Sequence, residues 1–216
     1  MRRGSLIGAA VIVLASLTLA GCATSVPGSE PSSPSSSASE SPSPTPIVAT
    51  GLVVSLEAIS VVNNDGSTGD SAQFSDGAAT LALLSHALGS TPPPVHLDAY
   101  GITSYDWGAL SLTVKTHDGS ALVVMTAPEL GGLALRSTEG IEVGSTLAEV
   151  KAVASPGTEF ASSATPDVYY GLEARAHPAT ESLTFPGRVG QDYIEVDLRG
   201  GVVVSLRTPF GDWQDV

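Results

Sequence analysis

The 216-residue chain contains only one cysteine, Cys22. A single thiol excludes an internal disulfide framework and a structural zinc site built on several thiolates. Basic residues are also scarce, since 9 Lys and Arg stand against 22 Asp and Glu, and the formal charge is −13. This acidic excess argues against binding to nucleic acid and against electrostatic attraction to anionic lipid.

The sequence also lacks a hydrophobic run long enough to cross a bilayer. Its N-terminal apolar stretch, Leu6 to Ala20, has 15 residues, whereas a transmembrane helix needs about 20. This stretch follows Arg2 and Arg3, as in a secretory signal peptide. Residues 1–21 are therefore predicted to be an export signal.

The export signal ends in Leu19-Ala20-Gly21-Cys22, which resembles the lipobox of bacterial lipoproteins. In that family, small residues before the cysteine fit the signal-peptidase groove, and the cysteine thiol takes a diacylglyceryl group. The resemblance implies cleavage before Cys22 and a lipid anchor on the extracytoplasmic face of the cell membrane. An ordinary secretory signal with an incidental cysteine is the alternative.

Serine and proline dominate residues 23–46, with ten Ser and six Pro among 24 positions. This composition lacks the large apolar side chains that offset chain entropy. We therefore predict that 22–46 is the lipidated cysteine with a disordered tether and that 47–216 is the folded domain. That domain is long enough to bury a core without disulfide or metal, and its negative charge predicts a monomer.

Two helices are predicted in the domain. Ser75-Asp76 supplies an N-cap for a helix that carries apolar residues at three- and four-residue spacing and ends at Gly89. Thr146-Leu147-Ala148-Glu149 is a capping box for a second helix, which ends at Ser155-Pro156-Gly157.

Apolar and β-branched runs predict several strands, and Asp118-Gly119 predicts a hairpin turn between two of them. The predicted strands are 52–62, 95–102, 110–116, 121–126, 133–136, 168–175, 193–198 and 202–208.

The two halves of the domain share their turn residues. At an offset of 69 residues the two helix starts coincide, and Gly131-Gly132 falls on Gly200-Gly201. We therefore predict an α+β fold of two tandem helix-plus-antiparallel-sheet repeats, over about residues 65–137 and 139–208. Each sheet is expected to keep one face open. Two α+β units that share these turns by chance are the alternative.

A motif at the second helix resembles a known superfamily. Residues 140–150, Gly-Ile-Glu-Val-Gly-Ser-Thr-Leu-Ala-Glu-Val, are similar to the helix-entry motif of the SmpA/BamE and β-lactamase-inhibitor-protein superfamily. The resemblance implies a concave sheet face that binds a protein, or an accessory role in envelope assembly. The chain departs from the inhibitor pattern because one cysteine cannot form its disulfides. As a whole, the chain also resembles small lipoproteins of high-GC Gram-positive bacteria.

No motif predicts a catalytic residue or a cofactor. Gly69-Asp70-Ser71 resembles the nucleophile block of GDSL esterases, but the Asp-x-x-His block expected near the C-terminus is absent, and no Gly-x-Ser-x-Gly elbow exists. The four histidines, at positions 86, 96, 117 and 177, form no metal motif.

Two further arrangements of possible metal ligands are not taken as metal sites. His96 and Asp98 have the spacing of one strand face, and a solvated face is the simpler interpretation. A loop of possible oxygen ligands does not match EF-hand spacing, so a polar turn is expected there; its residues are Asn63, Asp65, Ser67 and Asp70.

Aromatic residues make up 5% of the chain, and six of them are candidate interface anchors, since Tyr and Trp often hold protein interfaces. They are Tyr100, Tyr105, Trp107, Tyr169, Tyr170 and Trp213. The alternative is that they belong to the core. The predicted function is a lipid-anchored, non-enzymatic module that binds a protein or envelope component on its open sheet face. An envelope hydrolase and a small-solute-binding lipoprotein are the alternatives.

Overall fold

The computed structural model describes residues 45–161 and 167–213. The predicted signal peptide, the lipobox with Cys22 and the tether up to residue 44 lie outside the described residues. Half of the described residues are in strands and 13% are in helices. The helical elements of this part are α1 (Gly77–Ala87), the 3-10 helix η1 (Asp98–Tyr100) and α2 (Leu147–Val153). None of them has the length and apolar character of a membrane span.

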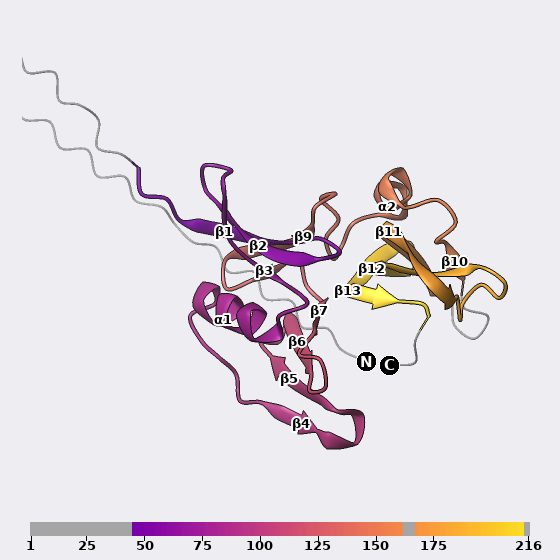
Figure 1. The fold of residues 1–216 in the computed structure, drawn as a ribbon. Helices are drawn as coiled ribbons and strands as arrows, with labels where there is room; N and C mark the ends of the chain where they lie inside the picture. Colours follow the sequence, from indigo (N-terminus) through magenta and orange to yellow (C-terminus); the bar gives the residue numbers. More distant parts are fainter. Residues whose placement is uncertain (1–44, 162–166, 214–216) are drawn as a thin grey trace, which may run out of the picture. The chain divides into compact units, whose positions relative to one another are not determined.

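The strands form two sheets (Figure 1). The first has five strands in the order β3-β2-β1-β9-β8, in which β1 and β9 are parallel and the other neighbours are antiparallel. Its strands are β1 (Ala49–Val54), β2 (Ala58–Asn63), β3 (Thr68–Gln73), β8 (Glu129–Leu130) and β9 (Leu133–Ser137).

The second sheet has eight strands in the order β10-β11-β12-β13-β7-β6-β5-β4, all antiparallel to their neighbours. Its strands are β4 (Val95–Leu97), β5 (Ile102–Asp106), β6 (Leu110–Lys115), β7 (Ala121–Met125), β10 (Phe160–Ala161), β11 (Val168–Glu181), β12 (Val189–Arg199) and β13 (Val202–Gly211). Pairing of β7 with β13 joins the two halves of the chain in this one sheet.

The predicted α+β fold of two helix-plus-sheet repeats is wrong, because the described part is mostly β and its strands form two sheets of five and eight strands. Strand β9, assigned to the first repeat, pairs with β1 in the five-stranded sheet. The shared glycine turns do not indicate a structural repeat, for a physical reason. Such turns recur wherever antiparallel strands reverse direction, and they do not specify which strand pairs with which.

Some predicted strands also differ from the observed ones. The strand predicted over 52–62 is the hairpin of β1 and β2, because the Ser55 hydroxyl accepts from the backbone N–H groups of Glu57 and Ala58 at 3.2 and 3.0 Å and closes a turn. Gly69-Asp70-Ser71, the segment compared with the esterase nucleophile block, lies in β3. Of the strand predicted over 95–102, the structure shows three residues as β4, followed by η1 and the start of β5.

Both helix starts are confirmed. The Asp76 carboxylate accepts from the backbone N–H of Ala79 at 2.9 Å, and Gly89 follows α1 with a φ of 70°. Thr146 and Glu149 form the predicted capping box of α2. The predicted hairpin turn is also present between β6 and β7, where Gly119 has a φ of 72°.

The two sheets share one hydrophobic core. Leu52 and Ile59 of the first sheet and Leu112 and Leu206 of the second are fully buried in it. Each lies on the inward side of a strand whose side chains alternate between two faces. The core therefore joins the sheets into one folded unit.

Side chains of the eight-stranded sheet also hold the β1–β2 turn. The Glu173 carboxylate accepts from the Leu56 backbone N–H at 2.7 Å, and Thr208 donates from Oγ1 to the Ser55 carbonyl at 2.9 Å. Arg175 forms an ion pair with Glu57. These contacts hold the β1–β2 turn against the eight-stranded sheet.

Candidate functional site

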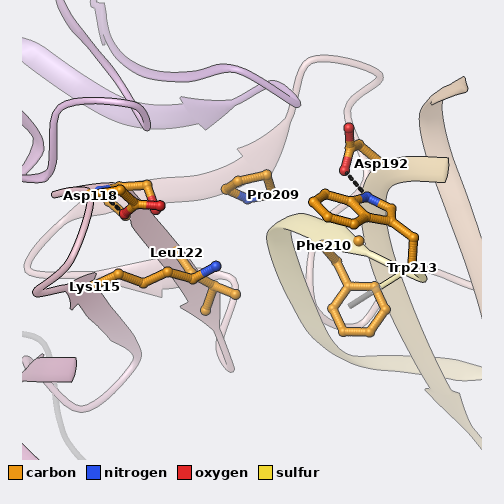
Figure 2. Close-up of a pocket in the computed structure, with 10 residues that line it drawn as sticks. Lys115, Asp118, Leu122, Asp192, Pro209, Phe210 and Trp213 are labelled. Atoms are coloured by element: carbon orange, nitrogen blue, oxygen red, sulfur yellow. Dashed lines mark hydrogen bonds between the residues drawn. The ribbon is translucent and has the colours of Figure 1, made fainter. Parts of the chain in front are cut away.

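The candidate site lies where the eight-stranded sheet opens between β7 and β13. The two strands pair over three positions only, the last being Thr208 with Val123. Beyond it β13 continues to Gly211, and Pro209 has no backbone N–H with which to extend the ladder. A pocket of about 250 Å³ is lined by residues of both separated strands (Figure 2).

Two walls of different chemistry line this pocket. The β6–β7 hairpin supplies Lys115, Asp118, Ser120 and Leu122, and Figure 2 shows Lys115 extending from this wall toward the middle. The opposite wall comes from β12, β13 and the residues that follow β13, namely Asp192, Pro209, Phe210, Gly211 and Trp213. A second hollow of about 550 Å³ shares Ser120, Asp192 and Pro209 with the first, so the two are adjacent.

The Asp192 carboxylate organises the second wall. One oxygen accepts from Trp213 Nε1 at 2.8 Å, and the other lies 3.0 Å from Nδ1 of His177. The imidazole also stacks on the indole, with ring centroids 3.9 Å apart and planes 22° from parallel. With Asp192 ionised, this contact is a hydrogen bond that His177 Nδ1–H donates, because a carboxylate only accepts.

Two glycines in the strands make room for Trp213. A Cβ at Gly190 would lie 2.4 Å from the Trp213 Cβ, and one at Gly211 would lie 2.9 Å from its Nε1. The buried Asp212 carboxylate accepts from Gln191 N and from the Ser182 hydroxyl, both at 2.6 Å. The wall is therefore built by close packing and hydrogen bonds.

The charged groups around the pocket differ in their partners. Asp118 accepts from the Ser120 backbone N–H at 2.8 Å, and this bond lowers the pKa of its carboxyl, to which the Lys115 charge adds a smaller effect. The Lys115 ammonium makes no hydrogen bond or salt bridge within the described residues. The chain's other lysine, Lys151, lies 3.7 Å from Glu159.

Of the six aromatic residues predicted as anchors, Trp213 is the one that lines this pocket. Tyr100 is 72% exposed in η1, near Val95 and Leu97 of the edge strand β4, which are also exposed.

The other four predicted anchors are more enclosed. Tyr105 and Trp107 pack against the core, and Trp107 donates from Nε1 to the Ser90 carbonyl at 2.9 Å. Tyr169 is stacked on Phe160 with centroids 4.7 Å apart, and burial raises the pKa of its hydroxyl. Tyr170 is 3% exposed and belongs to the core.

The other candidate groups of the sequence lie apart from this site. His96 contacts Thr103 across β4 and β5, and His117 contacts Asp118 within its own turn. His86 and Asp70 share a separate hollow of about 310 Å³ that Ser71 does not line. Asp98 lies in η1 and not on the strand of His96.

The oxygen-rich loop between β2 and β3 bonds to itself. Asn63 donates to the Ser67 hydroxyl at 3.0 Å, and the Asp65 carboxylate accepts from the Ser67 N–H at 2.9 Å. Across the described ranges, no cluster of three or more His, Cys, Asp or Glu residues is placed to hold a metal ion.

Sequence reasoning missed most of the site, including Lys115, His177 and Asp192. Lys115 comes from β6, whereas His177 and Asp192 come from the consecutive strands β11 and β12 much later in the chain. The signal that was available is Gly190 and Gly211, because a glycine inside a strand often marks close approach of another group.

Comparison of the chain with models of protein families, with curated proteins and with solved structures gives no match. The resemblances of the lipobox and of residues 140–150 therefore stay predictions.

Proposed function

We propose that this chain is a bacterial lipoprotein that binds a protein or envelope component outside the cell membrane. In this proposal Cys22 carries the lipid, the Ser/Pro-rich segment is the tether, and the pocket at the β7–β13 gap is the binding site. In place of a whole open sheet face, the proposal names one pocket on the eight-stranded sheet as the place where the ligand binds.

The observation that supports the binding site is the combination of a preformed wall and an ammonium that, among the described residues, has no hydrogen-bond or salt-bridge partner. Trp213 is fixed by Gly190, Gly211 and Asp192 before any ligand arrives. Rigid aromatic walls reduce the entropy lost on binding. The ammonium is that of Lys115, on the facing hairpin.

The anchor is tested by Cys22→Ser in the full-length chain. Since Cys22 is the only thiol, the variant is expected to take up no fatty-acid analogue and to leave the membrane fraction. Metabolic labelling followed by membrane fractionation measures both effects. Label that persists on the variant would refute the lipobox assignment.

The binding site is tested by cross-linking full-length protein in intact membranes and identifying what is captured. Trp213→Ala is expected to lose the captured component, because this change removes one wall of the pocket. Trp107→Ala, the chain's other tryptophan, is the matched control and is expected to retain it. Equal capture by both variants would contradict the proposal, provided that melting curves show both folded.

An envelope hydrolase is the second candidate, favoured by one observation. His177 and Asp192 form a hydrogen-bonded pair, and Ser75 and Ser120 line the same hollow. Within the described residues neither hydroxyl is hydrogen-bonded to His177, which an activated serine requires. Turnover of ester, peptide or glycan substrates that His177→Gln abolishes would favour this candidate.

A further inference from the structure

Among the described residues that line the pocket at the β7–β13 gap, the Lys115 ammonium is the charged group with no hydrogen-bond or salt-bridge partner in the protein. The two described carboxylates of this pocket have such partners, since Asp118 accepts from Ser120 and Asp192 accepts from Trp213. An ammonium has three donors and no acceptor. A ligand group that binds it directly is therefore a hydrogen-bond acceptor, and a negative charge on that group strengthens the bond.

The surroundings of Lys115 limit the charge of that group. Asp118 and Asp192 line the same pocket, and their charges would repel an anion with two negative charges more strongly than one with a single charge. Among the described residues, no arginine lines this pocket, although planar bidentate recognition of phosphate favours arginine. A single lysine acts as a point charge, which fits a carboxylate.

The rest of the lining is apolar. Leu122 lies beside Lys115, whereas Pro209 and the Phe210 ring belong to the opposite wall (Figure 2). His177 covers a face of the Trp213 indole, and Phe210 adds a second ring to the lining, with the Tyr193 ring 5.5 Å and the Arg207 guanidinium 5.4 Å from its centroid. At about 250 Å³, the pocket is smaller than the roughly 300–1,000 Å³ of drug-sized sites, and it suits one apolar residue or group.

We propose that this pocket binds a carboxylate with an apolar group next to it, such as the C-terminal residue of a peptide or a free aryl-substituted acid. Lys115 receives the carboxylate, and Leu122, Pro209 and Phe210 receive the apolar group. The inference rests on the proposed function, because it names the ligand chemistry of the same site.

The test uses the full-length protein in lipid nanodiscs with Trp107→Phe, so that Trp213 is the one emitting tryptophan. The probes are acetyl-Gly-Gly-Phe with a free C-terminus, the same peptide as its C-terminal amide, and 3-phenylpropionate. The free-acid peptide is expected to change the emission with saturation and to bind about 10- to 100-fold more tightly than the amide, the range of one charge-assisted hydrogen bond. Binding of 3-phenylpropionate alone would support a free acid as the source.

Variants of the two lysines test whether the Lys115 ammonium binds the ligand carboxylate. Lys115→Met is expected to weaken the free-acid probes by about 10- to 100-fold, Lys115→Arg to keep most of the affinity, and Lys151→Met to change nothing. Equal binding of acid and amide, equal binding by Lys115→Met, or no binding of any probe would overturn the inference. If that happens while Trp213→Ala still loses its captured component, the proposed function stands without this ligand chemistry.

Discussion

The two halves of the eight-stranded sheet use the same strand geometry for different chemistry. In strands β4 to β7 the side chains opposite the core are small and uncharged at several positions, as where Ser104 and Thr113 share a hydrogen bond of 3.2 Å. Strands β10 to β13 and their loops carry the stacked rings and a buried carboxylate, Glu195, which lies 3.3 Å from Arg207. The pocket lies where these halves meet and takes its lysine from one and its aromatic wall from the other.

The two halves of the sheet are stabilised by the same core, although their outward-facing side chains differ in chemistry. Leu112 of the first half and Leu172 of the second are both fully buried in the same core. The chemistry of one half can therefore vary on the outer face without loss of the common core.

The largest expected effect concerns that core. Leu112→Ala and Leu172→Ala should each lower the free energy of unfolding by about 2–5 kcal/mol, because each leaves a cavity. Urea denaturation should show one transition, with Trp107 and Trp213 reporting the same midpoint in single-tryptophan backgrounds. Two separate transitions would mean that the halves are independent folding units.

The next largest effect concerns the glycine under Trp213. Gly190→Ala should cost about 1–3 kcal/mol, because a Cβ there overlaps packed atoms at 2.4 and 2.5 Å. Displaced Trp213 should also emit at longer wavelength. Gly69→Ala is the control, since its nearest contact is 3.4 Å; if both variants melt alike, the close-packed wall is refuted.

A smaller effect is expected at the N-caps of α1 and α2, which lie in the first and second halves of the domain sequence. Asp76→Ala and Thr146→Ala should each cost about 1 kcal/mol, because each removes an acceptor for an otherwise unpaired helix N–H at α1 or α2. Ser75→Ala, next to the first cap, is the control. Thermal melting measures all three, and a cost for Ser75→Ala equal to that for Asp76→Ala would argue against the capping role.

The smallest expected effect is the pH response of Glu195. Burial raises the pKa of its carboxyl in the folded chain, with Arg207 opposing the shift. The folded state then binds more protons than the unfolded state, so this group's contribution to stability falls as the pH rises above 4.5 toward neutrality. Stability curves should show Glu195→Gln gaining on the wild type over this interval, with exposed Glu129→Gln as the control. A constant difference would contradict the sign.

Local signals made the helices predictable from sequence. The side chains of Asp76 and Thr146 accept hydrogen bonds from the backbone N–H three residues later. A few adjacent residues are therefore enough to predict where each helix begins. The break in the strand predicted over 52–62 depends on the Ser55 turn, which Glu173, Arg175 and Thr208 hold from the other sheet.

The pocket depends still more on distant partners. Asp192 meets His177 and Trp213, which lie 15 and 21 residues away in the chain, and Lys115 is brought opposite only by the β7–β13 pairing. That pairing cannot be derived from residue spacing. Of the residues around the pocket, Trp213 was predicted from the sequence as a candidate anchor, whereas Lys115, His177 and Asp192 were not. Gly190 and Gly211 are the sequence feature that indicates close packing at this place.

The position of β1 has a mechanical consequence. In the proposed lipoprotein, any pull from the membrane reaches the domain at the start of this strand. β1 is bonded along one side to β2 and along the other to β9, and so lies inside its sheet. Tension on the tether must shear two rows of hydrogen bonds to extract it, whereas an outer strand would peel from one row. In this proposal the load therefore falls first on the five-stranded sheet, whereas the strands that line the pocket belong to the other sheet.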